Sequence, residues 1–394
     1  MRGLRWTTAG ESHGRCLVAV LEGMPAGMAL DLGGVDRELA RRQVGYGRGG
    51  RMKIEEDRAE LLSGTRGGIT LGSPLAVAIA NADFVIERLP VPANPRPGHA
   101  DLAGCQKYAH ANPRDVLERA SARETAARVA LGAIARQLLE SFAIEIFAHV
   151  TELGGVAADP GAFDRAGPDR RRIRDASDLL SLDPDADSRI RERIDAARAD
   201  GDSLGGVFEV RVLGLPPGLG GYANPAERLT GRLGGALLSI PAMKGVEFGL
   251  GFEAARCPGS AVHDPIISAG ATPGPFGFLR RASNRAGGLE GGMTTGEPLV
   301  VRVAMKPIPS LRRGLPTVDL ATGEAVSATY QRSDVTSVPA ASVVGEAVVA
   351  LELASAFREK FGGDSLDAVR DAFAAWRARI AGLGAPARPP GKKE

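Results

Sequence analysis

One nine-residue frame occurs twice in this chain and limits what it can fold into. Gly-Gly-x-Thr-x-Gly-x-Pro-Leu is found at residues 67–75 and again at 291–299, and each copy runs into an apolar stretch typical of a buried strand. In both halves a predicted strand, at 15–21 and at 207–213, comes before the frame and is followed by a Gly-Pro turn. Two such turns can be alike by chance, but strand, turn and order all match. We therefore predict two similar halves packed together.

The two halves place the rest of the chain. We predict one catalytic domain over residues 1–382, with repeats at about 1–150 and 205–360, and a disordered tail over 383–394 that has little to bury. Helices are predicted at 35–43, 115–141, 186–200, 338–360 and 365–381.

Composition excludes several classes of protein. Of 394 residues, 44% are hydrophobic, and 49 Lys and Arg stand against 47 Asp and Glu, a net charge of +2. This balance is that of a globular protein and argues against a general nucleic-acid binder. No run of about eighteen apolar residues predicts a membrane span, and the N-terminus does not read as a signal peptide. Cys16, Cys105 and Cys257 are widely spaced, so we expect free thiols, no metal site and a cytoplasmic protein.

A basic, glycine-rich loop is the first candidate site. Arg41, Arg42, Arg48, Arg51 and Lys53 fall within thirteen residues that contain no acid. Glycine lets a ligand approach the backbone, and guanidinium groups match phosphate or carboxylate oxygens. The loop lacks the Walker pattern. It indicates a site for a small polyanion, or else a solvated basic loop.

Two histidines lie in short turn motifs. His13 is in Gly-Glu-Ser-His-Gly before the first strand, and His99 is in Arg-Pro-Gly-His-Ala-Asp. Either is suited to acid–base chemistry, and either can be a turn residue bonded to backbone. His149, in an apolar run, is read as structural.

A third motif, Arg-Ala-Ser-Ala-Arg-Glu-Thr, begins at Arg119. It falls near the start of the helix predicted at 115–141, where Arg119 and Arg123 would share one face. A positive helix end attracts phosphate, although ordinary Arg–Glu pairs are more common in such sequences.

Seven motifs occur in one fixed order, and the ordered set is more specific for a protein family than any one motif alone. They are Gly10 to Gly14, Gly45 to Met52, Arg96 to Asp101, Arg119 to Ala126, Lys244 to Gly249, Ala286 to Gly292 and Arg332 to Val335. This ordered set resembles the chorismate synthase family, and the resemblance runs from about residue 1 to residue 360.

The resemblance implies a fold and a reaction. The fold is α+β, a single-domain β-α-β sandwich of two similar halves, usually a homotetramer. The enzyme is a lyase that converts 5-enolpyruvylshikimate 3-phosphate to chorismate and phosphate by 1,4-trans elimination, the last step of the shikimate pathway to the aromatic amino acids. It needs reduced FMN without net redox change. We expect an external reductant, with NADPH as its ultimate source, because no added Rossmann-type unit is found. Neither nucleic acid nor membrane is an expected partner.

The resemblance also implies residue roles. Catalytic roles fall to His13, His99 and Asp334, with Ser12 and Ser121 in supporting hydrogen bonds. Flavin-binding positions are Arg119, Ala120, Ser121, Pro241, Ala242, Gly291, Lys306, Pro307, Ile308, Pro309, Ser310 and Arg332. Positions for the substrate's anionic groups or for NADP are Arg42, Arg48, Arg51 and Arg123.

Three positions depart from the family pattern, and two other functions stay open. Arg285 stands where Asn is usual, Thr294-Thr295 replaces Ser-Asn and Thr336-Ser337 replaces Cys-Ala. None removes a titrating group. The alternatives are a flavin-dependent oxidoreductase, which would show net redox, and a polyanion-binding module without catalysis, which would leave His13, His99 and Asp334 without a shared role.

Overall fold

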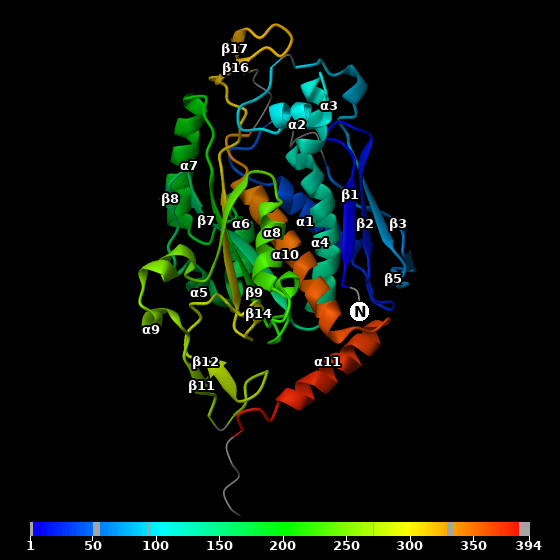
Figure 1. The fold of residues 1–394 in the computed structure, drawn as a ribbon, viewed down its shortest axis with the longest axis vertical. Coiled ribbons are helices and arrows are strands. Elements are labelled where there is room, and N and C mark those ends of the chain that lie inside the picture. The colour runs from blue at the N-terminus through cyan, green and yellow to red at the C-terminus, as the bar shows by residue number, and fades with distance from the viewer. Residues whose placement is uncertain (1–2, 50–55, 93, 271, 329–333, 386–394) are drawn as a thin grey trace, which may run out of the picture.

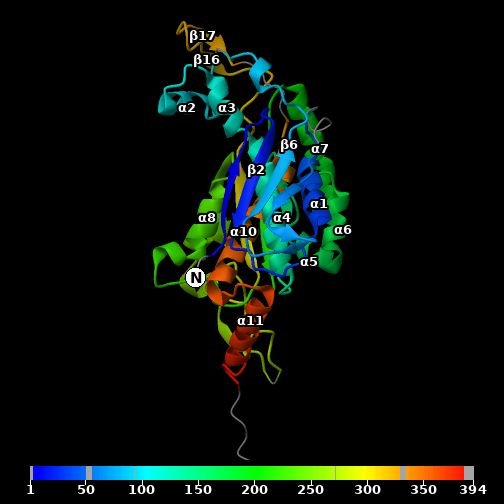
Figure 2. The same ribbon diagram turned by 90° about the vertical axis from the view of Figure 1, so that its right-hand side faces the viewer.

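A computed structural model describes residues 3–49, 56–92, 94–270, 272–328 and 334–385. The chain forms two antiparallel sheets with helices between them (Figures 1 and 2). The first sheet has the order β1 (Arg5–Ala9), β2 (Cys16–Glu22), β6 (Leu75–Ala80) and β3 (Glu60–Ser63). The second has the order β10 (Met243–Phe248), β15 (Leu299–Met305), β9 (Gly206–Leu213), β7 (Glu145–Leu153) and β8 (Val156–Ala157). This confirms the predicted α+β sandwich.

The middle layer holds α1 (Leu32–Gln43), α4 (Thr125–Glu140), α8 (Leu229–Leu238) and α10 (Val338–Phe361). Helices α4 and α10 cross where Gly132 meets Ala347: a Cβ on Gly132 would lie 2.4 Å from the Cβ of Ala347. Any larger residue would therefore push the two helices apart. Helices α5 (Ala162–Ala166), α6 (Arg170–Ala176) and α7 (Pro184–Ala199) accompany the second sheet near β7 and β8 (Figure 1), and Arg174 of α6 reaches Glu346 of α10 at 3.5 Å.

Helix α10 is apolar enough and, with 24 residues, long enough to cross a membrane by composition alone. Its most apolar window is 94% buried inside the protein. One apolar core runs through the sandwich and includes Val343, Leu351 and Phe357 of this helix. The hydropathy of α10 is therefore explained by its central place in the fold.

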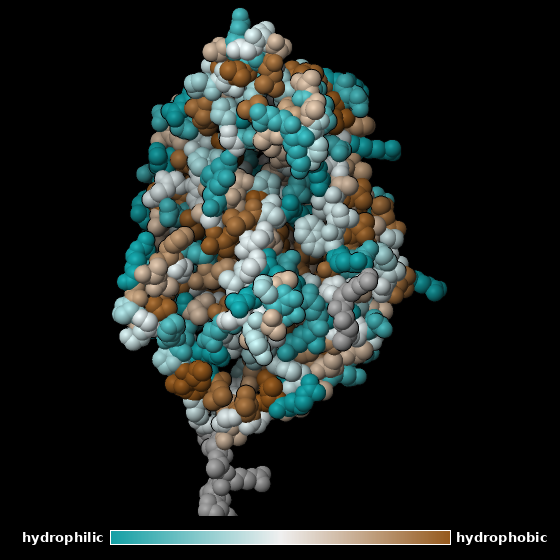
Figure 3. All heavy atoms as spheres, in the orientation of Figure 1, coloured by the Kyte–Doolittle hydropathy of each residue, from teal (hydrophilic) through white to brown (hydrophobic). Residues whose placement is uncertain are grey.

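The smaller elements lie at the two ends of the sandwich. At one end are α2 (Asp101–Tyr108), α3 (Pro113–Ala120) and the hairpin β16 (Pro316–Val318) with β17 (Ala325–Ser327). At the other are α9 (Gly259–Val262), the hairpin β11 (Ile266–Ser268) with β12 (Leu279–Arg281), and α11 (Leu366–Ile380). Figure 3 shows apolar residues gathered at this lower end. The tail predicted from residue 383 begins within a turn over residues 381–384, and residues 386–394 lie outside the described residues.

The repeated frame forms the same small structure twice. In each copy a two-residue turn with positive φ, at Gly67-Gly68 and at Gly291-Gly292, joins a short hairpin: β4 (Thr65–Arg66) with β5 (Ile69–Thr70), and β13 (Leu289–Glu290) with β14 (Met293–Thr294). The hydroxyl of Thr70 donates to the carbonyl of Pro25 at 2.6 Å, and that of Thr294 to the carbonyl of Pro216 at 2.6 Å. These shared contacts support the predicted internal repeat, whose boundaries stay a prediction.

The helix predicted at 115–141 is wrong as one element. It is divided into α3, a short 3-10 turn η3 (Ala122–Glu124) and α4. Ser121 is the break: its backbone is extended, and its side chain accepts a hydrogen bond from the backbone N–H of Arg123. This capping outcompetes continuation of the helix. Arg119 and Arg123 therefore do not share a helix face, and Arg119 is exposed while Arg123 is buried.

Candidate active site

His13 lies in the turn between β1 and β2 and is fixed by α3. Its Nδ1 lies 3.0 Å and 3.1 Å from the two carboxylate oxygens of Glu118, and its backbone N–H donates to the same carboxylate at 2.9 Å. Arg114, one turn earlier on α3, donates to Glu118 at 3.2 Å. Burial raises the pKa of Glu118, but these bonds from His13 and Arg114 outweigh it and leave the pKa below its usual value. Glu118 is thus an ionised partner.

His99 has the same arrangement, built from other elements. Its Nδ1 lies 2.5 Å from Asp101, the first residue of α2, and Arg96 donates to Asp101 at 2.8 Å. Burial raises the pKa of Asp101, yet the bonds from His99 and Arg96 bring it well below its usual range. The side chains of His13 and His99 keep 17% and 16% of their surface exposed, while the two carboxylates keep 2%. The Nδ1 of each imidazole therefore contacts a buried carboxylate, while the Nε2 of His13 lies 3.8 Å from Asp83 and the Nε2 of His99 lies 3.4 Å from Arg96 Nη2.

Arg48 and Asp334 form an ion pair. Arg48 Nη1 lies 3.1 Å from Asp334 and donates to the hydroxyl of Ser337 at 3.1 Å. Ser337 donates to Asp334 at 2.7 Å, and the backbone N–H of Gly49 does so at 2.6 Å. A predicted anion-binding residue and a predicted proton-handling residue thus form one contact group. The departure Thr336-Ser337 takes part in it through Ser337.

Arg42 and Arg123 are buried rather than exposed to solvent. Arg42, in the last turn of α1, donates to the hydroxyl of Thr125 at 3.1 Å and to the carbonyl of Ala122 at 2.9 Å. Arg123 donates to Asp57 at 2.5 Å. Burial lowers the pKa of Arg42 to about 10, and the neighbouring Arg48 and Arg123 add to this against the opposing effect of Asp57. Within the described residues, the buried guanidinium groups of Arg42 and Arg123 thus share the carboxylate of Asp57.

Several predicted flavin-binding residues lie at this same end. The carbonyl of Ala242, a residue with positive φ, accepts from the backbone N–H of Lys306 at 3.0 Å. Lys306 also donates to the carbonyl of Gly98, next to His99, and Ser310 accepts from Arg96 at 3.3 Å. The segment of predicted flavin-binding residues Lys306, Pro307, Ile308, Pro309 and Ser310 is therefore tied to the His99 turn.

Arg119, Ala120 and Ser121 approach from the other half of the chain. Arg119 donates to the carbonyls of Gly10 and Thr8, each at 2.9 Å, beside the turn that carries Ser12 and His13. Ser12 itself is buried, with its backbone N–H on the carbonyl of Glu118.

The structure does not bring Gly291 to this group. Gly291 belongs to the β13–β14 turn at the Leu299 end of β15, whereas Lys306 follows the opposite end of that strand. Seven residues of strand separate the two ends by roughly 20 Å. Arg51 and Arg332 lie outside the described residues.

Three residues of the site were missed in the sequence, and a fourth, Asp101, was considered there only together with His99. Glu118 and Asp101 orient the two histidines. Asp57 lies between two arginines. Lys244 lies near Lys306, and burial together with Lys244 lowers the pKa of Lys306. Only Asp101 had a local signal, because it is two residues from His99. In the described part of the chain, no three His, Cys, Asp or Glu residues gather as a metal site.

The other departures from the family pattern have structural roles. Thr294 is the buried residue of the repeated hairpin, and Thr336 is fully buried before α10. Arg285 is exposed, and its backbone N–H donates to Asp264 at 2.8 Å.

Comparison with known proteins decides the family. The family model described as chorismate synthase matches residues 4–357. The chain belongs to the chorismate synthase family. It is 54% identical over 381 residues to the chorismate synthase of Desulforudis audaxviator, covering 93% of this chain and 96% of that protein. The chorismate synthase of Trichlorobacter lovleyi is also 54% identical, with 93% and 97% covered.

A solved chorismate synthase has the same fold. Its crystal structure gives a TM-score of 0.78 at 42% identity and covers 96% of this chain and 99% of that one. As a member of the chorismate synthase family, the chain is a lyase that makes chorismate. The resemblance drawn from seven motifs is confirmed.

Proposed function

We propose that the end of the sandwich around His13 and His99 carries out the phosphate elimination from 5-enolpyruvylshikimate 3-phosphate. The observation that carries this proposal is the matched pair of histidines. Each directs Nδ1 at a buried carboxylate that an arginine also contacts. Two such imidazoles at one end of the fold are what a reaction with separate proton and phosphate steps requires.

The carboxylates decide which nitrogen is chemically active. An ionised carboxylate only accepts hydrogen bonds, so the Nδ1 of His13 is its donor toward Glu118. The Nε2 of His13 is then the atom that takes or gives the proton. By the same argument the Nδ1 of His99 donates to Asp101, and its Nε2, which lies 3.4 Å from Arg96 Nη2, is the atom that we assign to the departing phosphate. Asp334 assists proton transfer near the flavin, and Ser12 and Ser121 support the hydrogen bonds around it.

The arginines bind the substrate's anionic groups. The substrate carries a phosphate and two carboxylates, and the group Arg42, Arg48, Arg51 and Arg123 supplies the opposite charge. Within the described residues, Arg42 and Arg123 share one carboxylate, that of Asp57, and Arg42 Nη1 has no hydrogen-bond partner. Cations placed in advance stabilise the charge that develops as phosphate leaves.

The residues around Lys306 fit a flavin mononucleotide. Burial, and then the neighbouring Lys244, lower the pKa of Lys306, and no carboxylate of the described residues pairs with either lysine. A phosphate group would relieve that repulsion. Reduced FMN, when bound, supplies electron density that eases the loss of phosphate. We assign its binding to Arg119, Ala120, Ser121, Pro241, Ala242, Arg332 and residues 306–310.

Further properties follow by family likeness. We assign the chain to the cytoplasm, as a homotetramer served by an external flavin reductant with NADPH as the ultimate electron source. Residues 45–50 spell Gly-x-Gly-x-x-Gly, but they follow α1 and not a strand, so they lack the setting of a dinucleotide-binding turn. This supports an external reductant. Gly291, at the far end of β15, completes a flavin site only if a second copy of the chain supplies it.

The test is phosphate released per flavin under anaerobic conditions, followed together with flavin absorbance. With reduced FMN we expect many phosphates per flavin and a flavin that ends reduced, because elimination leaves the oxidation level of the carbon ring unchanged. Oxidised FMN should bind and give no turnover. One phosphate per flavin oxidised would favour the oxidoreductase, and equal activity with oxidised FMN would remove the flavin from the reaction.

A further inference from the structure

Asp57 is a buried carboxylate between two of the arginines. It lies just before β3, and its side chain has no exposed surface. One oxygen accepts from Arg123 Nη1 at 2.5 Å, and the other lies 3.7 Å from Arg42 Nη1. Among the described residues, that second oxygen and Arg42 Nη1 have no hydrogen-bond partner. Among the described residues, the Asp57 carboxylate therefore lies between two buried guanidinium groups.

Asn81, at the end of β6, connects the same arginine to the catalytic turn. Its side-chain oxygen accepts from Arg123 Nε at 2.9 Å. Its amide nitrogen donates to the carbonyls of Glu11 at 3.1 Å and Gly14 at 2.7 Å. These two carbonyls lie on either side of His13. Both donor positions of the amide are thus used on the histidine turn, and its oxygen is used on Arg123.

We propose that Asp57 and Asn81 are positioning residues for the reaction: Asp57 fixes Arg42 and Arg123 in the wall of the anion site, and Asn81 ties that wall to His13. The inference rests on the proposed function, since it takes the substrate-binding role of the arginines and the role of His13 as given. Neither residue touches the reacting atoms; each acts through the side chains that do.

Charge and geometry explain why both residues are needed. Without the Asp57 charge, two like charges would be buried side by side, and Arg42 and Arg123 would move apart. A displacement of about 1 Å in a binding group is enough to cost on the order of 100-fold in rate or affinity. Asn81 would pass such a displacement to the His13 turn, because it bonds both parts directly.

The experiment measures substrate affinity in the protein loaded with oxidised FMN, where turnover does not interfere. Titration calorimetry would be run on Asp57→Asn, Asn81→Ala and Arg48→Ala. The control is Glu209→Gln on β9, a buried carboxylate 3.3 Å from His149 and 2.5 Å from Arg211, in the other sheet. FMN affinity and melting temperature are measured for each variant. The substitution Asp57→Asn keeps the shape of the side chain, removes its charge and replaces one acceptor oxygen with an amide donor.

We expect Asp57→Asn and Asn81→Ala to raise the substrate dissociation constant about 10-fold or more. FMN affinity should change less than about twofold, and Glu209→Gln should lower the melting temperature without changing substrate affinity. A purely structural role would make Asp57→Asn behave like Glu209→Gln, and this result would overturn the inference. If Asp57→Asn does not fold, Asn81→Ala decides alone. Loss of affinity in Arg48→Ala alone would overturn only this inference, whereas unchanged affinity in all three variants would also contradict the proposed anion site.

Discussion

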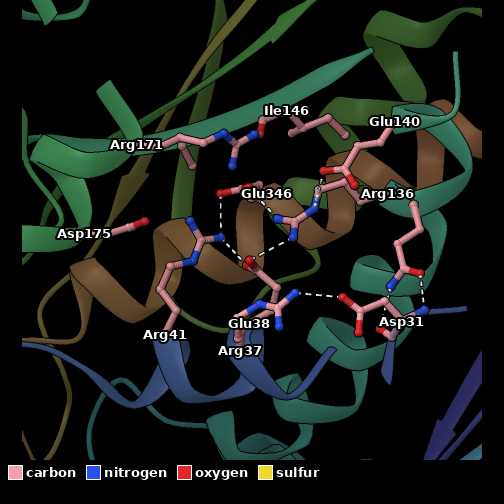
Figure 4. Close-up of polar contacts among 12 residues, drawn as sticks. Asp31, Arg37, Glu38, Arg41, Arg136, Glu140, Ile146, Arg171, Asp175 and Glu346 are labelled. Carbon is pink, nitrogen blue, oxygen red and sulfur yellow. Dashed lines mark hydrogen bonds and ion pairs between the residues drawn. The ribbon is translucent and has the colours of Figure 1, made fainter. Parts of the chain in front are cut away.

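The interior of the helical layer and the active-site end each contain a cluster of buried arginines and carboxylates, and the contacts within the two clusters differ. Arg41 and Arg42 are consecutive, yet they belong to different clusters. Arg41 lies 2.7 Å from Glu346 of α10, which Arg136 of α4 also reaches at 3.0 Å (Figure 4). Glu38 joins the same group from α1. Arg42 instead faces Asp57 at 3.7 Å, with Arg48 and Arg123 near it.

The pKa values of Arg41 and Arg42 shift in opposite directions. Burial lowers the pKa of Arg41, but Glu346 and Glu38 more than offset it and leave the pKa above its ordinary value. In the site, Asp57 fails to offset burial and the other arginines, so the pKa of Arg42 falls. In the interior cluster the pKa of Arg136 is raised as well, whereas that of Arg174 is lowered by its burial and by Arg41.

The clusters differ in contact: Arg41 and Arg136 lie within hydrogen-bond distance of Glu346, while Arg42 lies 3.7 Å from Asp57 and its Nη1 has no hydrogen-bond partner among the described residues. The active-site cluster therefore leaves a cationic group that an anionic substrate can neutralise.

The largest expected difference concerns the histidines of the two regions. His13→Ala should lower turnover by about 10²- to 10⁴-fold, the range for loss of a general acid or base, with an unchanged melting temperature. His149→Ala is the matched control, because His149 also pairs with a buried carboxylate, Glu209, but is itself buried in β7. Anaerobic phosphate release measures both. Full turnover in His13→Ala would make His13 a turn residue.

The interior cluster should fail in stability and not in binding. Glu346→Gln leaves Arg41, Arg136 and Arg174 without their shared carboxylate, which we expect to lower the free energy of unfolding by about 3–5 kcal/mol. Urea denaturation measures this loss, and titration with substrate should give the wild-type affinity for the folded variant. If Glu346→Gln lost as much free energy of substrate binding as free energy of unfolding, the two clusters would not differ in function.

The active-site cluster should show the reverse behaviour. Arg48→Ala should weaken substrate binding by about 2–5 kcal/mol, because one desolvated partner of an anion is removed. Its control is Arg232→Ala on α8, a half-buried arginine paired with Glu352 and Glu359. Titration calorimetry should find wild-type affinity in that control. An equal affinity in Arg48→Ala would assign this arginine to holding Asp334 only.

A smaller effect appears in the pH dependence of stability. Burial raises the pKa of Glu346, but the surrounding arginines lower it well below its usual value of 4.5. A carboxyl whose pKa is lowered by folding stabilises the protein above that value, and this contribution is lost as the pH falls toward the lowered pKa. The stability gap between wild type and Glu346→Gln should therefore stay nearly constant from pH 7 to about pH 5 and shrink as the pH falls below 4.5 toward about 2. A gap that stays constant below pH 4.5 would show that Glu346 acts through packing alone.

The sequence predicted most of the sandwich and only part of the site. Apolar periodicity and Gly-Pro turns are local signals, and they were enough to predict the repeated frame, the strands and α10. The break at Ser121 was not, since capping by one hydroxyl overrode a continuous helical pattern. Glu118 and Asp57 were missed because their partners, His13 and Arg123, are 105 and 66 residues away in the chain. Long-range pairing of this kind leaves no mark in a local motif.

The most direct test of the account is a crystal structure with FMN and substrate bound. We predict that a substrate anion lies within hydrogen-bond distance of the Arg48 guanidinium group. The Nε2 atoms of His13 and His99 should be directed at the substrate and flavin. The contacts of Glu346 should stay unchanged. Substrate bound away from Arg48, or with both histidines directed elsewhere, would contradict the claim that this arginine cluster marks the active site.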